Sequence, residues 1–348
     1  MMAHLANGLS PEKYELHLGL ITDSDPDRFE LPSWVTIHCL AAARVRSSIL
    51  RLLSLIWRLH PRLILSGMFH LNFLILLLRP FLPRGTSVLI RQNGTVSSAL
   101  AFGDTPTYTW MLYKLLYRHA DRIICQASSM AHDLARTLSI PEQQITVAPN
   151  PLDIDAVRAV ANRVDASKPT KGPHLLAIGR LSPVKGYDLL LDALAIVRSS
   201  YPDAHLSIIG SGSQEAFLKT MCACLGLASA VRFLGEVSQP ANYFADASLF
   251  VLSSRHEGMP NALLEAAAAG LPLVATPASG GVIDLLQNQE GAWVAREVSS
   301  AALAESLLAA LRVLEPKKKF AHRFIEPFRI ENSIHAYEEL IDATLAHA

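Results

Sequence analysis

Short apolar segments alternate with longer segments of helical periodicity through the second half of the chain. Apolar runs of this length, bounded by turn residues, are typical of buried parallel strands. The predicted strands are His174–Ile178, His205–Ile209, Val231–Leu234, Ser248–Leu252, Pro272–Ala275 and Ala292–Ala295. Between them, helices are predicted at about 186–200, 214–226, 239–246, 260–269, 281–288 and 299–314. Because alternating strands and helices form a parallel sheet covered by helices, this half is predicted to be a doubly wound α/β domain.

The first half shows the same alternation less regularly. Its predicted strands are Tyr14–Ile21, Leu63–Ser66, Ser87–Arg91, Arg122–Cys125 and Ile145–Ala148. Helices are predicted at about 41–59, 106–119 and 128–138. Residues 1–9 have the pattern of the end of a helix, although an α/β domain usually opens with a strand and a turn. We therefore expect the first strand of this half to be missing.

A polar segment, residues 166–173, separates the two halves and is rich in proline, lysine, serine and glycine. Such a composition is typical of a linker. A chain of 348 residues is also longer than one ordinary domain. The sequence therefore predicts an N-terminal domain at residues 1–165 and a C-terminal domain at residues 170–329.

Composition narrows the classes of function. Hydrophobic residues make up 50% of the chain and charged residues 18%, which is typical of a folded globular protein. The formal net charge is zero, so the global charge gives no sign of nucleic-acid binding. Cys39, Cys125, Cys222 and Cys224 lack the spacing of a zinc site. This cysteine usage and the absence of a visible signal peptide predict a cytoplasmic protein, and no run is long and apolar enough to span a membrane.

One segment is unusually basic. Residues 31–103 contain eight arginines and neither aspartate nor glutamate. Arg44, Arg51 and Arg58 are seven residues apart, so a helix over residues 41–59 would present them as one stripe. The stripe is either the solvated edge of a core helix or a cationic, apolar surface that binds anionic lipid or a lipid-linked diphosphate. The absence of acidic residues favours the second interpretation.

The loop and helix after the strand Ser248–Leu252 concentrate the candidate chemistry. The loop carries Glu257, and Pro260 suits the first position of the helix that follows. Backbone N–H groups at the start of such a helix attract phosphates and oxygen-rich ligands, and open α/β sheets bind ligands in this crevice. Farther along the helix, Glu265 is surrounded by alanine and leucine. It either reaches a ligand in the crevice or lies on the only hydrated edge of the helix.

Three other loops are predicted at the same edge of the sheet. Arg180 and Lys185 follow the strand His174–Ile178, where two cations suit a diphosphate, although surface charges beside a turn are an equally good interpretation. The segment 210–212 is half of a dinucleotide-binding fingerprint and is a weak signal. Residues 276–281 end in paired glycines that let backbone approach a ligand. Together the loops predict a site for a phosphate-bearing ligand with many hydroxyl groups.

His70 is a separate candidate in the first half of the chain. It follows the predicted strand Leu63–Ser66, where it either faces a ligand crevice or is a structural histidine.

These residues together resemble a known family. The motifs are Gly179-Arg180 with Lys185-Gly186, then Glu257-Gly-Met-Pro-Asn-Ala-Leu-Leu-Glu265-Ala, then Gly280-Gly281, and they resemble the family 4 retaining glycosyltransferases. The resemblance is looser in residues 120–124 and 145–153. It implies the GT-B fold, with two Rossmann-like domains facing across a cleft and a C-terminal helix, residues 330–348, that packs back on the N-terminal domain.

The resemblance also implies roles for individual residues. Arg180 and Lys185 would hold the donor diphosphate and stabilise the leaving nucleotide, Glu257 would contact the donor sugar, and Glu265 would contact the ribose. His70 matches a histidine close to the reacting sugar, so the implied catalytic set is His70, Arg180, Lys185 and Glu257. No metal or cofactor is needed in this scheme, because protein cations support the leaving group. The other residues implied to lie near the donor are Gly179, Gly258, Met259, Pro260, Asn261, Ala262, Gly280 and Gly281.

The function implied is a hexosyltransferase of the cytoplasm, peripheral on the inner face of the membrane. It would move a sugar from a nucleotide-sugar, with UDP expected, to a lipid-linked or glycan acceptor in synthesis of surface polysaccharide, exopolysaccharide or O-antigen. The family's first strand and its glycine-rich loop are expected to be missing, and Asp284 stands where the family usually has Glu. Without that strand and loop, an alternative function stays open, namely a non-catalytic nucleotide-sugar-binding or partner subunit. A sugar-nucleotide epimerase is disfavoured by Glu257 and Glu265.

Overall fold

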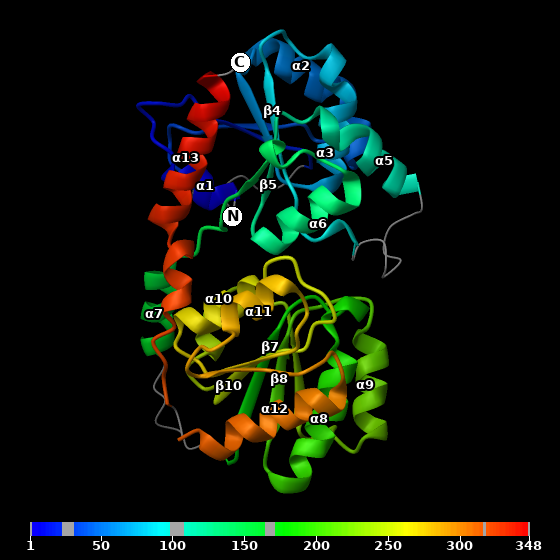
Figure 1. The fold of residues 1–348 in the computed structure, drawn as a ribbon, viewed down its shortest axis with the longest axis vertical. Coiled ribbons are helices and arrows are strands. Elements are labelled where there is room, and N and C mark those ends of the chain that lie inside the picture. Colours follow the sequence, from blue (N-terminus) through cyan, green and yellow to red (C-terminus); the bar gives the residue numbers. More distant parts are fainter. Residues whose placement is uncertain (1, 23–30, 98–107, 164–170, 316–317, 347–348) are drawn as a thin grey trace. The chain divides into compact units, whose positions relative to one another are not determined.

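The computed structural model describes residues 2–22, 31–97, 108–163, 171–315 and 318–346 (Figure 1). Its contacts divide the chain into two compact units. Unit 1 contains Met1–Pro151 and Pro327–Ala348, and unit 2 contains Leu152–Glu326. The helix α7, Ile154–Arg163, therefore belongs with unit 2 rather than with the residues that precede it.

Unit 2 is built on a six-stranded parallel sheet with the strand order β12-β11-β10-β7-β8-β9. The chain runs outward from β7 in one direction and then returns to add β10 on its other side, so the order reverses between these two strands. In open α/β sheets, ligands bind beyond the carboxyl ends of the strands at such a reversal. The strands are β7 His174–Ile178, β8 His205–Ile209, β9 Val231–Gly235, β10 Leu249–Leu252, β11 Leu273–Ala275 and β12 Ala292–Val294.

Helices cover this sheet, and α8 and α12 pack side by side (Figure 1). The core consists of strand residues such as Leu175, Leu206 and Leu249, which are fully buried between the helical layers. The predicted helix at 239–246 is wrong, because only a short 3-10 turn, Pro240–Tyr243, forms after the proline. The helices are α8 Tyr187–Ser200, α9 Glu215–Cys224, α10 Asn261–Ala268, α11 Gly280–Leu286 and α12 Ser300–Val313.

The described residues of unit 1 form two separate parallel sheets. The strands β1, His17–Leu20, and β2, Thr36–Cys39, form a two-stranded sheet. The second sheet has four strands in chain order, β3 Leu63–Ser66, β4 Ser87–Arg91, β5 Arg122–Cys125 and β6 Ile145–Val147. The helices are α1 Met2–Gly8, α2 Ile49–Leu59, α3 Phe69–Leu78, α5 Tyr108–Leu116, α6 Ser128–Leu138 and α13 Ile330–Ala346.

The C-terminal helix α13 is anchored to the start of the chain. The Tyr14 hydroxyl donates to Asp342 Oδ1 at 2.6 Å, and the backbone N–H of Ser10 donates to Glu338 Oε1 at 3.1 Å. Gly8 packs so closely on α13 that a Cβ atom there would lie 2.5 Å from Ile334 Cγ1. A side chain at the end of α1 would therefore force Ile334 to shift.

Replacing Gly8 with alanine is expected to lower the free energy of unfolding by about 1–3 kcal/mol, because the added methyl group would clash with the side chain of Ile334. Urea denaturation monitored by circular dichroism would measure the change. Gly94→Ala is the matched control, since a Cβ atom at Gly94 meets nothing within 4 Å. Equal stability of the two variants would contradict the packing argument.

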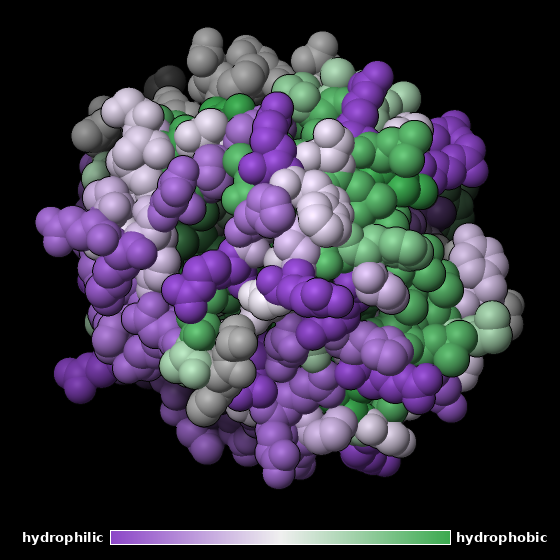
Figure 2. All heavy atoms as spheres, turned by 90° about the horizontal axis from the view of Figure 1, so that it is seen from above, coloured by the Kyte–Doolittle hydropathy of each residue, from purple (hydrophilic) through white to green (hydrophobic). Residues whose placement is uncertain are grey.

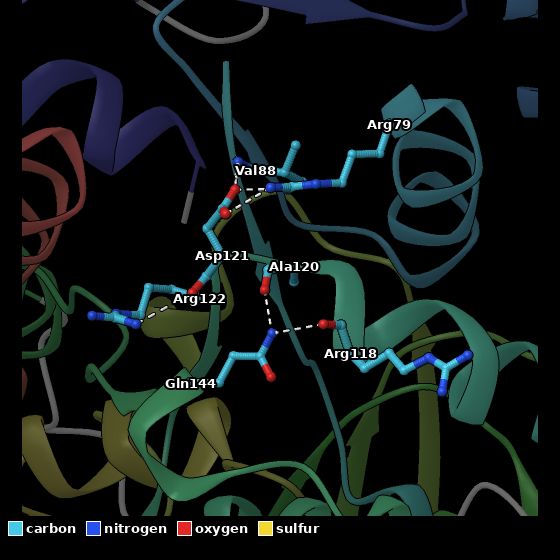
Figure 3. A network of polar contacts seen from close by, with 7 residues as sticks. All are labelled: Arg79, Val88, Arg118, Ala120, Asp121, Arg122 and Gln144. Atoms are coloured by element: carbon cyan, nitrogen blue, oxygen red, sulfur yellow. Dashed lines mark hydrogen bonds and ion pairs between the residues drawn. The ribbon is translucent and has the colours of Figure 1, made fainter. Parts of the chain in front are cut away.

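Asp121, which directly precedes β5, links the C-terminal end of α3 to the strand β4 (Figure 3). Both of its carboxylate oxygens accept hydrogen bonds from Arg79 at 2.7 Å, and Oδ2 also accepts the N–H of Val88 at 2.6 Å. Burial alone would raise the pKa of Asp121, but the bonds from Arg79 and Val88 hold it below its usual value. Nearby, Gln144 Nε2 donates to the carbonyl oxygen of Arg118 at 3.1 Å and to that of Ala120 (Figure 3).

The predicted arginine stripe does not form as one helical row. The helix α2 begins at Ile49 after a 3-10 turn, Val45–Ser48, and Arg44 precedes that turn with an extended backbone. Arg51 Nη1 donates to the carbonyl oxygens of Leu40 and Ala41, both at 2.7 Å. The prediction of a helix from residue 41 was therefore wrong, because this loop, which Arg51 stabilises, replaces the first helical turns.

Large apolar side chains are exposed on α2, α3 and α5 and on the turn Arg79–Phe81. Seen from above, apolar atoms gather on the side of unit 1 where these helices lie (Figure 2). We call this surface the apolar face and define it by Leu50, Trp57, Leu77, Phe81, Met111 and Leu115. Within the described ranges, no helix is long and apolar enough to cross a membrane.

Candidate active site

The loops after β7 and β10 meet at the carboxyl edge of the unit 2 sheet. Gly186 has a φ of 61°, and a Cβ atom there would lie 2.2 Å from the carbonyl oxygen of Ser253, so only glycine allows this approach. The Ser253 hydroxyl donates to the carbonyl oxygen of Lys185 at 2.9 Å, and the N–H of Arg255 donates to that of Val184 at 2.8 Å. These contacts fix the two loops against each other.

Lys185 and Glu257, both predicted site residues, form an ion pair across this junction. Lys185 Nζ lies 2.7 Å from Glu257 Oε1, and the Ser254 hydroxyl donates to the same oxygen. The Glu257 side chain is only 7% exposed, whereas that of Lys185 is 26% exposed. A buried carboxylate requires such partners, so the pair sets the orientation of both groups. Arg180 begins the same loop and is exposed.

A second ion pair, between Arg255 and Asp188, holds the same two loops from outside. Arg255 Nη1 and Nη2 donate to Asp188 Oδ1 and Oδ2 at 2.7 and 2.6 Å, and Nη1 also donates to the carbonyl oxygen of Pro183 at 2.8 Å. Burial raises the pKa of Asp188, but the bonds and charge of Arg255 outweigh it and keep the pKa below its usual value. We call this pair the loop clasp.

The helix α10 starts beside the ion pair. Pro260 precedes it, and no side chain caps its first turn. The N–H of Asn261 donates to the carbonyl oxygen of Met259 at 3.1 Å, which leaves the N–H of Ala262 available in this turn. Glu265 lies one turn farther along and is partly buried, and burial raises its pKa. In the described part of the chain, its carboxylate has no ion pair or hydrogen bond. A partly desolvated carboxylate without a protein partner is suited to ligand hydroxyl groups.

The remaining predicted positions differ in their exposure. Gly258 and Met259, between Glu257 and α10, are partly exposed. Gly280 is the first residue of α11, and Gly281, the second, is buried. The weak dinucleotide signal at 210–212 has a packing role instead. A Cβ atom at Gly210 would lie 2.1 Å from the carbonyl oxygen of Gly179, so these residues allow two loops to touch.

His70 lies in unit 1, apart from the other predicted residues, which are all in unit 2. It occupies the first turn of α3, is exposed, and has its ring centroid 3.6 Å from that of Phe69. Its role at a reacting sugar stays a prediction. Across the described ranges, no three histidine, cysteine, aspartate or glutamate side chains form a group that could hold a metal ion.

Two family models match the chain in succession. The model described as glycosyltransferase family 4 matches residues 1–156, and the model described as glycosyl transferases group 1 matches residues 161–327. The chain is a family 4, group 1 glycosyltransferase. The family expected from the motifs around Lys185 and Glu257 is thereby confirmed.

Curated relatives of this glycosyltransferase have varied names. The lipopolysaccharide core biosynthesis glycosyltransferase LpsE of Rhizobium meliloti is 29% identical over 61% of this chain and 58% of its own length. A glycogen synthase of Mycobacterium tuberculosis is 32% identical over 62% of this chain and 50% of its own length. The chain thus spans about half the length of the curated relatives it matches.

Solved structures match nearly the whole glycosyltransferase. The sucrose-phosphate synthase of Thermosynechococcus elongatus gives a TM-score of 0.82 at 18% identity and covers 99% of this chain and 92% of its own. Anabaena HepE in complex with UDP and glucose gives 0.77 at 15% identity, with 98% and 95% covered. The predicted fold class, α/β of the GT-B type, is confirmed.

The loop clasp is a feature of the glycosyltransferase that sequence reasoning missed. Arg255 lies two residues before Glu257, and Asp188 lies two residues after Gly186. The available signal was that these two opposite charges follow two strands whose ends were predicted at the same edge of the sheet. That signal was incomplete without the strand order, which places β10 beside β7.

Replacing Asp188 with asparagine is expected to lower the free energy of unfolding by about 1 kcal/mol at pH 7, because Arg255 loses a bidentate partner that is about one-third exposed. The native pKa of Asp188 is depressed, so its contribution is complete above the unfolded pKa and declines as pH falls through the lower native pKa. Urea denaturation should therefore show a constant difference between wild type and variant from pH 7 to about 4.5, which shrinks below about pH 4. Arg296→Ala, which breaks an exposed pair with Glu305, is the control and should change little. A difference that grows on acidification would contradict the argument.

Proposed function

We propose that this glycosyltransferase moves a sugar from a UDP-sugar to a lipid-linked or glycan acceptor in surface polysaccharide assembly, with retention of the anomeric configuration. The Lys185–Glu257 ion pair at the junction of the β7 and β10 loops is the observation that carries the proposal. Two kinds of relatives support it. Anabaena HepE has been crystallised with UDP-glucose, and LpsE is named for lipopolysaccharide core biosynthesis.

The chemistry follows from where charge develops. When the bond between the sugar and the diphosphate breaks, negative charge grows on the leaving diphosphate, and positive charge grows on the sugar ring. Arg180 begins one short loop and Lys185 ends it, so both can provide cations for the diphosphate. Glu257 accepts hydrogen bonds from sugar hydroxyls, and the N–H of Ala262 at the uncapped start of α10 provides a further donor. Preorganised groups of this kind stabilise the transition state without a metal ion.

Two further roles complete the proposal. Glu265 accepts hydrogen bonds from the ribose hydroxyls, which would supply the partners that its partly buried carboxylate lacks among the described residues. His70 of unit 1 contacts the reacting sugar. Unit 2 accordingly binds the donor, and unit 1 provides the acceptor side.

Calorimetric titration with UDP, GDP and ADP tests the donor site. We expect UDP to bind most tightly and Glu265→Ala to weaken UDP binding about tenfold to a hundredfold, since the hydrogen bonds to a charged group are lost. 2′-Deoxy-UDP sharpens the test, because it should bind wild type more weakly than UDP but bind Glu265→Ala nearly as well as UDP does. Equal losses for both nucleotides in the variant would contradict a ribose role for Glu265.

Turnover decides between the leading proposal and its alternative. Release of UDP from UDP-glucose, UDP-galactose or UDP-N-acetylglucosamine in the presence of a membrane lipid extract would support a transferase. Tight UDP binding without turnover of any donor would instead support a non-catalytic nucleotide-sugar-binding subunit. Interconversion of one UDP-sugar into another without an acceptor would identify an epimerase.

We also propose that unit 1 binds the surface of an anionic membrane through the apolar face and nearby arginines. The proposal is supported by the apolar face (Figure 2). Its exposed residues Leu50 and Trp57 lie within residues 31–103, which contain no acidic residue. Arg44→Glu with Arg58→Glu is expected to reduce co-sedimentation with phosphatidylglycerol vesicles at least fivefold, while Arg51 is left intact because it stabilises a loop. Equal binding of the variant, or equal binding to neutral phosphatidylcholine vesicles, would contradict the proposal.

A further inference from the structure

Arg91, the last residue of β4, is buried without an acidic partner. The residue is 7% exposed, and no carboxylate within the described ranges pairs with it. Its guanidinium instead donates through Nη1 to Oδ1 of Asn93 and through Nη2 to Oδ1 of Asn150. Burial of a cation among neutral groups costs free energy that an ion pair would partly offset. The hydrogen bonds to the two amides therefore hold this cation in place.

Arg91 fixes the direction in which the amide of Asn93 points. Arginine has donors only, so the group of Asn93 that faces it must be the carbonyl oxygen. The amide nitrogen then points away from Arg91, and Nδ2 donates to the carbonyl oxygen of Gly67 at 2.5 Å. Asn93 is exposed, and an exposed amide without such partners would turn freely about its last torsion. The Asn93 side chain thus ties the loop after β4 to the loop after β3.

The segment that Asn93 ties down carries His70. Gly67 lies in the short connection between β3 and α3, and His70 is the second residue of the helix. No side chain caps the start of α3. One turn into the helix, Nδ2 of Asn72 donates to the carbonyl oxygen of Arg91 at 2.9 Å. The backbone around His70 is therefore held on both sides by the end of β4 and the loop that follows it.

The His70 side chain depends on this backbone for its place. It is exposed, and its imidazole forms neither a hydrogen bond nor an ion pair with another residue that the structure describes. Its ring contact is with Phe69, the preceding residue, at 3.6 Å between centroids. A side chain with so few contacts is positioned mainly by the residue that carries it. The position of the imidazole is thus set by the first turn of α3.

We propose that Asn93, oriented by Arg91, is a positioning residue for His70. The inference rests on the proposed function, in which His70 contacts the reacting sugar. Arg91 holds the Asn93 amide, the amide holds the carbonyl group of Gly67, and the start of α3 holds the imidazole where that contact is made. Neither Arg91 nor Asn93 touches the sugar. Loss of this tether lowers the rate of transfer because a reacting group is misplaced, although none is removed.

The variant Asn93→Asp breaks the tether but keeps its anchor. Aspartate has nearly the same size and still accepts from Arg91, now as an ion pair, but it has no N–H for the carbonyl oxygen of Gly67. Hydrogen exchange measured by mass spectrometry should be at least about fivefold faster for the amides of residues 72–74, in the first turns of α3. We expect kcat for sugar transfer to fall about tenfold to a hundredfold. The melting temperature should not fall, since the buried cation gains a counter-charge.

Asn288→Asp is the matched control for this change of charge. Asn288 is an exposed residue of unit 2 with a φ of 61°, a conformation that aspartate also adopts. The control should leave exchange, kcat and the melting temperature unchanged. Unchanged exchange of residues 72–74 in Asn93→Asp would overturn the proposal. A joint fall of kcat and melting temperature would also overturn it, because Asn93 would then support the fold as a whole.

The variant His70→Ala decides whether Asn93 acts through His70. In that background, Asn93→Asp should lower kcat by less than about twofold. Multiplication of the two losses would contradict the proposal, because Asn93 would then act on the sugar directly. A fully active His70→Ala variant would contradict it too, since no task would remain for the positioned imidazole. Absence of sugar transfer by the wild type would count against the proposed function instead, and the exchange of residues 72–74 would still decide whether the tether exists.

Discussion

Replacement of Lys185 with alanine is expected to lower kcat for sugar transfer by a factor of about 10² to 10³. The reason is the loss of a fixed cation where charge develops on the leaving diphosphate, a contribution comparable to removal of one oxyanion-stabilising group. Lys185→Arg should recover only part of the activity, because a planar guanidinium cannot occupy the position of a compact ammonium group 2.7 Å from Glu257. Initial rates of UDP release at saturating donor would measure both variants.

The chain provides a matched control for this change. Lys219 of α9 forms an ion pair of the same 2.7 Å length with Glu215, but on an exposed helix surface. Lys219→Ala should leave kcat within about twofold of wild type, since exposed pairs contribute little. If Lys185→Ala were as active as Lys219→Ala, Lys185 would not support the leaving group and the proposed chemistry would fail. If both variants lost activity, a general effect of charge would be the explanation.

The ion pair also indicates which contacts of Lys185 and Glu257 the donor must replace when it binds. Lys185 and Glu257 neutralise each other in the structure, and Glu257 is almost completely buried. A diphosphate near Lys185 would share that cation, and sugar hydroxyls would become the new donors to Glu257. The pair therefore keeps two opposite charges close together without a ligand, and in the proposed complex each charge gains a partner from the donor.

The strands of unit 2 were predictable because the central strands are buried on both faces. β7 and β8 are buried almost throughout, so their sequences are continuous apolar runs bounded by turns. The strand β2, Thr36–Cys39, was missed because it is short, partly exposed and contains polar residues. The helix α3 was missed for the opposite reason, since it is apolar on all sides and has no periodicity to detect.

Tertiary contacts explain the other differences. The start of α2 was placed too early because the seven-residue spacing of Arg44 and Arg51 matches a helix, whereas Arg51 instead stabilises the carbonyl groups of a loop. The positions of Lys185 and Glu257 at one sheet edge could be predicted from the strand–loop–helix pattern. Their direct pairing could not, because it depends on β10 lying beside β7, and these strands are far apart in the sequence.

Replacement of Glu257 with glutamine is expected to lower kcat/KM by about a hundredfold while the fold is retained. Glutamine keeps the size of the side chain and one oxygen for the Ser254 hydroxyl, but it removes the charge that orients Lys185 and that accepts sugar hydroxyls. The free energy of unfolding should fall by only about 1 kcal/mol, because Lys185 is exposed enough to reach solvent. Steady-state kinetics and urea denaturation on the same preparation separate the two effects. Glu305→Gln, at an exposed ion pair with Arg296, is the control and should change neither quantity.

The double variant Lys185→Ala with Glu257→Gln tests whether the two residues act as one unit. If they do, its loss of kcat/KM should be much smaller than the product of the two single losses, because each single change already disables the pair. Simple multiplication of the losses would mean that Lys185 and Glu257 act independently on different parts of the donor. A Glu257→Gln variant that kept wild-type kcat/KM would remove Glu257 from the reaction and reduce the ion pair to a structural contact between the β7 and β10 loops.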